Sequence, residues 1–137
     1  MLAVFDPNVI ISALLSSKGS PVSLIQAWMN GDFELMTSPL LLAELQRVFT
    51  YPKLRSRIKA EEVDRLIGWL QRFAVGVQDP QESAAWSSPD PKDDYLLALA
   101  WKEKAILVSG DHHLLGLQAG QPIMSPAAFL SFLTDQG

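Results

Sequence analysis

Short apolar runs alternate with longer amphipathic stretches along this chain of 137 residues. The runs LAVF, FELM and AILV are rich in aliphatic residues and too short for helices, which is typical of strands buried on both faces. The pattern predicts strands at residues 2–6, 33–38, 75–78, 105–111 and 121–125.

The stretches between these runs have the apolar spacing and the end signals of helices. The predicted helices cover residues 8–16, 20–31, 38–51, 59–74, 93–104 and 126–135. Ser20 and Ser38 each precede a proline and are expected to cap their helices. In the fourth helix the apolar positions are Val63, Leu66, Ile67, Leu70 and Phe73. The fifth, which contains YLLALAW, has almost no polar side and is expected to be buried all round.

Strands that alternate with helices predict an α/β fold of three layers, α/β/α, with a central parallel sheet and helices on both faces. A length of 137 residues matches one domain, covering residues 1–137. In open parallel sheets, ligands bind beyond the carboxyl ends of the strands, where the strand order reverses. Functional side chains are therefore expected at those ends.

Composition adds little to this picture, except through the distribution of charge. The chain has no cysteine, no basic leader and no apolar run near the ~18 residues of a membrane span, so a cytoplasmic protein without a membrane segment is expected. The net charge is −4, yet seven of the eleven Lys and Arg residues lie within residues 47–72. Arg47, Lys53, Arg55 and Arg57 are the candidates for contacts to a polyanion. The alternative interpretation is a solvated surface between two helices.

Acidic side chains occur where the predicted strands end and where one helix begins. Asp6 and Asp111 follow two strands that should end at the same edge of the sheet, although a helix cap and a turn would explain them equally well. Glu44 interrupts the apolar stripe of its helix and should face a cation, a donor or a wet cleft, unless it lies at the margin of the buried face. Asp93 and Asp94, with Asp90 nearby, precede the most apolar helix, where simple capping is the alternative.

If Asp6, Glu44, Asp93 and Asp111 converge, they cannot all stay ionised without a counter-ion. Two carboxylates within ~4 Å repel each other by ~4 kcal/mol at an effective dielectric constant of 20. Oxygen ligands without cysteine favour Mg²⁺ or Mn²⁺, and such a site suits phosphoryl chemistry.

These motifs resemble the PIN-domain family, the nuclease family that includes the toxin ribonucleases of bacterial toxin–antitoxin pairs. VFDPNVIISALL matches the opening strand that ends in Asp, with Asp6 first and Asn8 second. LLLAELQRV supplies Glu44, DPKDDYLLALA supplies Asp93, and LVSGD supplies Asp111. Two positions differ from the family pattern: Asp94 stands where Asn is frequent, and Ser109 stands where Thr is usual.

The resemblance implies an endoribonuclease that depends on Mg²⁺ or Mn²⁺. Asp6, Asp93 and Asp111 would bind the metal, and Glu44 would be a further ligand or would orient the attacking water. Asn8, Ser12 and Ser109 would support them through hydrogen bonds, and Asp94 and Asp90 would lie next to the ligands. RNA is the implied substrate, and an antitoxin and a second copy of the chain are the implied protein partners.

Three other functions have some support in the sequence. A signalling module similar to a phospho-accepting receiver domain needs its pair of acids after the first strand, whereas Asp93 and Asp94 come late in the chain. A phosphatase similar to the haloacid dehalogenases needs an Asp two residues after the first, where this chain has Asn8. A non-catalytic PIN-like module that binds RNA or a protein would have no need to keep four acids. His112 and His113 are adjacent in sequence, so their side chains are expected to point in different directions, and neither is expected to be catalytic. Trp28, Trp69 and Trp101 are expected in the core, and Trp86 is the candidate for a contact to RNA.

Overall fold

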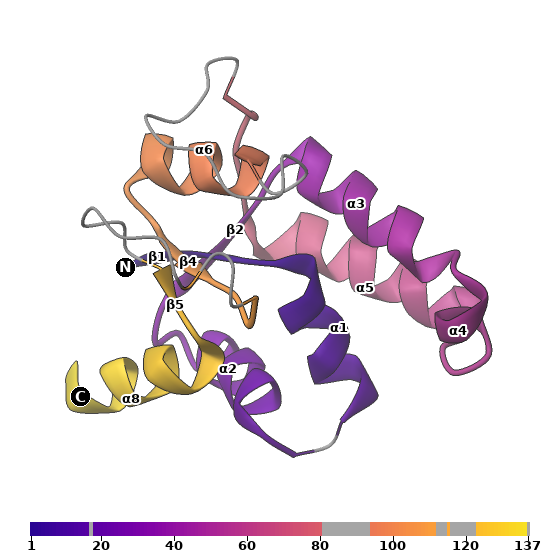
Figure 1. The fold of residues 1–137 in the computed structure, drawn as a ribbon, viewed down its shortest axis with the longest axis horizontal. Helices are drawn as coiled ribbons and strands as arrows, with labels where there is room; N and C mark the ends of the chain where they lie inside the picture. Colours follow the sequence, from indigo (N-terminus) through magenta and orange to yellow (C-terminus); the bar gives the residue numbers. More distant parts are fainter. Residues whose placement is uncertain (17, 81–93, 112–114, 116–122, 137) are drawn as a thin grey trace.

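The computed structural model describes residues 1–16, 18–80, 94–111, 115 and 123–136. Figure 1 shows its helices and strands along the chain. In order, they are β1 (Leu2–Phe5), α1 (Pro7–Leu15), α2 (Ser20–Met29), β2 (Glu34–Thr37), α3 (Pro39–Phe49), α4 (Pro52–Arg55), α5 (Ala60–Phe73), β3 (Val75–Gly76), α6 (Asp94–Glu103), β4 (Ile106–Val108), β5 (Ile123–Met124) and α8 (Pro126–Gln136).

The strands form one parallel sheet in the order β3-β2-β1-β4-β5. β1 is the central strand, and Ala3 is in register with Leu35 of β2 on one side and with Ile106 of β4 on the other. The chain first builds outward from β1 through β2 and β3, and then continues on the other side with β4 and β5. The strand order therefore reverses at β1 and β4, and the carboxyl ends of these two strands are where a ligand site is expected.

Helices cover both faces of the sheet, as the sequence predicts. α6 packs on β1 and β4 from one side, whereas α2 and α8 pack together on the other side, as Figure 1 shows. The prediction of a three-layer α/β fold with a parallel sheet is confirmed. Within the described ranges no single helix is long and apolar enough to cross a membrane; α1 and α2 pass that test only as a pair, by length and composition, and they are bent by 99°.

α3 and α5 pack side by side and extend to one side of the sheet, with the short helix α4 at their outer end (Figure 1). α4 is not predicted from the sequence, because its four residues are too few to show a period. Pro52 occupies its first turn, where a proline needs no hydrogen-bond partner. This turn lets the chain reverse between the two longer helices.

The cap predicted for α2 is wrong, whereas the cap predicted for α3 is confirmed. Ser20 is the first residue of α2, and the capping position is taken by Gly19, which has no side chain to donate to or accept from the helix. Gly19 has φ of 107°, a conformation that glycine adopts at little cost, so the chain turns one residue earlier than predicted. At α3, Ser38 Oγ accepts a hydrogen bond of 3.3 Å from the Leu41 N–H.

Two aromatic residues from helices with apolar patterns lie at the surface, and one of them, Trp101, was expected in the core. Trp101 is 50% exposed because the buried part of α6 ends at Ala100, so α6 is not buried all round. Phe73, the last residue of α5, is 58% exposed. Trp28 and Trp69 are half-buried and pack against each other, with ring centroids 4.7 Å apart.

Candidate active site

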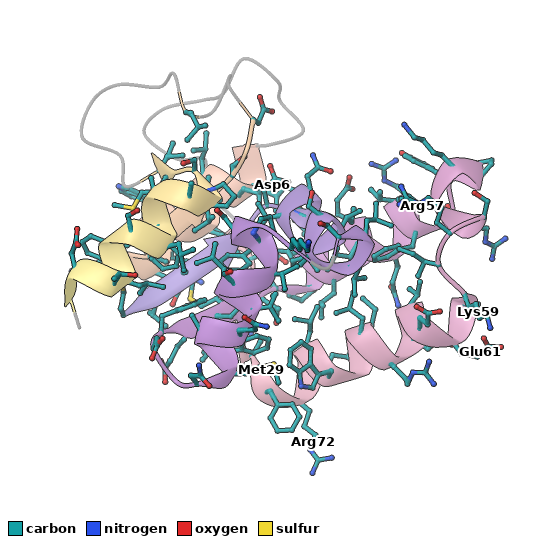
Figure 2. The ribbon with its side chains drawn as sticks, turned by 90° about the horizontal axis from the view of Figure 1, so that it is seen from below. Asp6, Met29, Arg57, Lys59, Glu61 and Arg72 are labelled. Atoms are coloured by element: carbon teal, nitrogen blue, oxygen red, sulfur yellow. The ribbon has the colours of Figure 1, made fainter. Side chains whose placement is uncertain are left out.

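Asp6 lies directly after β1 and serves as the N-cap of α1. Its Oδ1 accepts a hydrogen bond of 3.0 Å from the Asn8 N–H, and Pro7 begins the helix. The residue is only 5% exposed, which is unusual for a carboxylate used as a cap. The cap interpretation of Asp6 is thus correct, and its burial shows that capping is not the whole description. Figure 2 shows Asp6 on the opposite side of the view from Met29 and Arg72.

Ser109 joins the ends of β1 and β4 through a chain of hydrogen bonds. Its Oγ donates to Asp6 Oδ2 at 2.9 Å and accepts from the Asp111 N–H at 3.0 Å. Ser109 is completely buried, and the Asp6 N–H donates to the Val108 carbonyl at 2.9 Å beside it. The parallel sheet therefore brings Asp6 and Asp111 to the same edge, as predicted, and the serine that replaces the usual threonine keeps the hydroxyl that connects them.

Burial raises the pKa of Asp6 above its ordinary value, because the ionised carboxylate loses hydration. The hydrogen bonds from the Asn8 N–H and the Ser109 hydroxyl act in the opposite direction. The negative charges of Asp111 and Glu44 raise the pKa further, so both carboxylates are near enough for Asp6 to sense their charge. Burial and neighbouring negative charge thus both make Asp6 costly to ionise.

Glu44 does not point freely into solvent. Its side chain is 33% exposed, and both of its oxygens accept hydrogen bonds from Arg47, one turn later in α3: Nε donates to Oε2 at 3.1 Å and Nη2 donates to Oε1 at 2.5 Å. Arg47 also donates from Nη1 to the Tyr51 hydroxyl. Arg47, which was predicted to contact RNA, is therefore an ion-pair partner of a predicted site residue.

The structure describes only one of the three acids predicted at the start of α6. Asp90 and Asp93 lie outside the described residues, and Asp94 is the first residue of α6. α6 leads into β4 through a turn at Lys104, and the Ala105 N–H donates to the Ala100 carbonyl at 2.9 Å. In Figure 1 α6 runs back along the sheet before β4 begins.

The acids present suit a hard divalent cation by their chemistry. Each oxygen of Asp6 accepts one hydrogen bond in the structure and keeps a further lone pair, which could bind a metal. Carboxylate oxygens are the ligands that Mg²⁺ and Mn²⁺ prefer. Among the residues that the structure describes, no group of three or more His, Cys, Asp or Glu side chains could hold a metal ion by itself.

A cavity of about 310 Å³ adjoins this site at the first turns of α1. Asn8, Ser12 and Asp111 contribute its polar lining. The two α1 residues predicted to support the acids are exposed toward this space, and Asn8 reaches Asp6 through its backbone. Pro21 and Pro126 also line the cavity. Their place in the lining was not predicted, because an apolar lining residue has no distinctive sequence signal.

The remaining predicted RNA contacts lie at the outer end of the α3–α5 pair. Lys53, Arg55 and Arg57 are exposed in and after α4. Figure 2 shows Arg57 well to one side of Asp6, at the same end of the molecule as Lys59 and Glu61. The basic residues therefore do not join the acidic site directly. His112, His113 and Trp86 lie outside the described residues.

Comparison with known proteins assigns the chain to a family. Residues 3–113 match the family described as PIN domain. The uncharacterized protein MJ1680 of Methanocaldococcus jannaschii is 30% identical over 116 residues, which are 84% of this chain and 74% of that relative. The chain belongs to the PIN domain family.

Three solved structures share the fold. PAE2754 from Pyrobaculum aerophilum has a TM-score of 0.65 at 13% identity, and the match covers 99% of this chain and 91% of that one. VapBC2 from Rickettsia felis, bound to a DNA fragment from their promoter, has a TM-score of 0.65 at 14% identity, with 91% and 98% covered. FitAcB from Neisseria gonorrhoeae has a TM-score of 0.56 at 16% identity, also with 91% and 98% covered. At these identities the likeness concerns the fold alone.

Proposed function

We propose that this protein is a divalent-metal-dependent endoribonuclease. The observation that carries the proposal is the buried Asp6, which is joined through Ser109 to the backbone of Asp111 where the strand order reverses. Burial and the negative charges of Asp111 and Glu44 raise the pKa of Asp6, and a bound cation would offset the cost of ionising this carboxylate. Membership of the PIN domain family supports nuclease chemistry at this position.

The residues would divide the work as follows. Asp6, Asp93 and Asp111 would hold Mg²⁺ or Mn²⁺, and Glu44 would be a further ligand or would orient the attacking water. A bound divalent ion would supply an activated water and offset the charge that develops on the scissile phosphate. Ser109 keeps the Asp6 carboxylate in one orientation, because its hydroxyl is held on both sides. The cavity beside Asn8 and Ser12 would accept part of the substrate.

The substrate and partner assignments rest on charge, fold and family. Lys53, Arg55 and Arg57 are exposed cations that would contact RNA phosphates away from the cut bond. We also propose that the protein is the toxin of a toxin–antitoxin pair, forms a homodimer and acts in the cytoplasm. The resemblance to toxin ribonucleases supports this assignment, and so does the fold shared with VapBC2 and FitAcB.

Incubation of the pure protein with RNA and with a phosphomonoester, each with Mg²⁺, Mn²⁺ or EDTA, tests the proposal. We expect RNA to be cleaved with Mg²⁺ or Mn²⁺ and not in EDTA. In Asp6→Asn and Asp111→Asn the rate of RNA cleavage should fall at least about 100-fold, because each substitution removes a negative ligand. Asp32→Asn, an exposed substitution in the turn before β2, is the matched control and should cleave as the wild type does.

Three results would contradict the proposal. Cleavage that Asp6→Asn retains in full would show that the acidic site is not the catalytic one. Hydrolysis of the phosphomonoester without cleavage of RNA would favour a phosphatase. Binding of RNA without cleavage under any metal would favour a non-catalytic module.

A further inference from the structure

Four large apolar side chains gather at the surface where Trp28 of α2 contacts Trp69 of α5. Met29 is 67% exposed and Phe73 is 58% exposed, whereas the two tryptophans are half-buried and pack on the core. A cavity of about 340 Å³ lies among these side chains and is lined by them. We call Trp28, Met29, Trp69 and Phe73 the aromatic patch. Exposed apolar clusters of this kind are typical of sites that contact another molecule.

The rings of the aromatic patch hold one another in place. Trp69 contacts Trp28 with ring centroids 4.7 Å apart, and it contacts Phe73 with centroids 6.4 Å apart. The Cζ atom of Arg72 lies over the Phe73 ring, 5.3 Å from its centroid. Trp, Phe, Met and Arg are the residue types that are enriched where proteins contact each other. The patch therefore has the composition of a protein-binding site.

Positive charge borders the aromatic patch, although the chain as a whole has a net charge of −4. Arg65 and Arg72 are exposed on the same side of α5 as Trp69, and neither forms an ion pair with another described residue. On the α2 side the nearest acid in sequence is Asp32, three residues after Met29. The acids of α5 lie in its first turns, at Glu61, Glu62 and Asp64. A partner that carries negative charge beside an apolar face would complement this surface.

We propose that the aromatic patch binds an acidic amphipathic helix of a protein partner. The apolar face of this helix covers the cavity, and its carboxylates pair with Arg65 and Arg72. Figure 2 shows Met29 and Arg72 on the opposite side of the view from Asp6, so the helix binds away from the candidate active site. The inference goes beyond the proposed function, since it needs neither RNA nor a metal ion.

A second copy of the chain fits this surface less well than an acidic helix does. Two aromatic patches that face each other would bring together Arg65 and Arg72 of both copies, with Asp32 of each copy as the nearest acid. Positive charge would then stay unpaired beside buried apolar surface, which is unfavourable. An acidic helix instead offers a carboxylate to each arginine. The charge balance therefore favours a partner of different sequence.

Fluorescence anisotropy of a labelled synthetic helix measures this binding. The probe is a peptide of about 16 residues, long enough to form a helix, with Leu and Trp at every third or fourth position and Glu on both flanks. A second peptide carries Lys in place of every Glu. In EDTA and at low salt, we expect the full chain to bind the Glu peptide at least about tenfold more tightly than the Lys peptide. Met29→Asp places a charge on the patch and should weaken binding of the Glu peptide about tenfold.

Reversal of a single charge tests the electrostatic part of the proposal. Arg72→Glu should weaken binding of the Glu peptide about five- to tenfold and strengthen binding of the Lys peptide, because it replaces an attraction by a repulsion and the reverse. Arg57→Glu makes the same change at an exposed position that Figure 2 shows well away from Arg72. It controls for net charge and should bind both peptides as the wild type does. Circular dichroism checks that each variant is folded.

The proposal is overturned if the full chain does not bind the Glu peptide, or if it binds the two peptides equally. A wild-type dimer that Met29→Asp converts to a monomer, measured by size-exclusion chromatography with light scattering, would assign the patch to a second copy instead. Displacement of the Glu peptide by an RNA oligonucleotide would assign the patch to RNA and would also overturn the proposal. Failure of the nuclease assay leaves the peptide measurement unaffected, so the two proposals can fail separately.

Discussion

At the scale of single residues, the Asp6 carboxylate caps a helix and also lies at the proposed metal site. One oxygen caps α1 through the Asn8 N–H, and the other accepts from the Ser109 hydroxyl. Capping alone is compatible with exposure to water, whereas this carboxylate is buried, and the charges of Asp111 and Glu44 raise its pKa further. The fold thus keeps a group that is costly to ionise at the position where a metal would lower that cost.

Asp6→Asn is expected to stabilise the fold at neutral pH while it abolishes activity. Because burial raises the pKa of Asp6, the folded state binds its proton more tightly than the unfolded state does. The stability that Asp6 contributes is therefore fully present below the ordinary value of 3.8 and is lost as the pH rises through the higher pKa of the folded protein. Asparagine caps a helix as well as aspartate and has no charge to lose.

Urea denaturation without metal ions, at pH 7.5 and at pH 5, measures this difference. Asp6→Asn should have the higher free energy of unfolding at pH 7.5, and its advantage should shrink at pH 5. Asp32→Asn should show no comparable trend. A variant that is less stable than the wild type at pH 7.5 would mean that the hydrogen bonds from Asn8 and Ser109 outweigh the loss of hydration.

At the scale of elements, α3 carries both partners of the Glu44–Arg47 pair, and its amino end is held by two side chains. Ser38 Oγ accepts from the Leu41 N–H at 3.3 Å, and Asp79 Oδ2 accepts from the Leu40 N–H at 2.9 Å. Asp79 comes from the segment after β3, so it ties α3 to the edge of the sheet. A negative side chain at this end also interacts favourably with the helix dipole.

Ser38→Ala is expected to lower the free energy of unfolding by about 1 kcal/mol, because the Leu41 N–H loses its acceptor. Ser38→Thr keeps the hydroxyl and is the matched control, with a smaller loss. Urea denaturation followed by circular dichroism measures both. Equal losses in the two variants would show that the space around the buried Ser38, and not the cap, decides its contribution.

At the scale of the whole molecule, aromatic packing joins the terminal helix to the centre of the sheet. Phe33 lies between Phe5 of β1 and Phe129 of α8, with ring centroids 5.7 and 5.1 Å away. Phe5 and Phe129 are completely buried. The three rings come from the start, the first third and the end of the chain. This part of the core is therefore complete only when α8 packs against the sheet.

Phe129→Ala is expected to lower the free energy of unfolding by about 3–5 kcal/mol, since it leaves a cavity under α8. Phe73→Ala removes the same atoms from a side chain that is 58% exposed, and it should cost less than about 1 kcal/mol. Urea denaturation of the two variants compares them directly. Similar losses would mean that the aromatic cluster around Trp69 and Phe73 contributes more to stability than its exposure indicates.

Much of this architecture is predictable from the sequence because it depends on local patterns. The alternation of strands and helices, the prolines in first turns and the caps at Asp6 and Ser38 depend on neighbours within about four residues. The Glu44–Arg47 pair was predictable too, since residues three apart on a helix are neighbours. Arg47 was instead predicted to contact RNA together with the basic residues around α4. That prediction counted positive charges along the sequence and did not consider which side chain each of them faces.

Exposure at element ends was not predictable in the same way. Phe73 and Trp101 are apolar residues in apolar patterns, but periodicity does not tell how far a helix runs beyond the layer on which it packs. α4 was missed for a related reason, since four residues carry no period. Both failures concern where one element stops relative to another, which is a property of packing.

By itself, the sequence determined the α/β class, the parallel arrangement and the order in which the acidic residues appear along the chain. Only the tertiary structure decided that the Asp6 carboxylate receives its hydrogen bond from Ser109, a residue 103 positions away. It also decided that Asp79 caps a helix 39 residues earlier. The physical reason is that a local pattern sets backbone conformation and burial, whereas the partner of a buried polar group is whichever complementary group the packed sheet brings within about 3 Å.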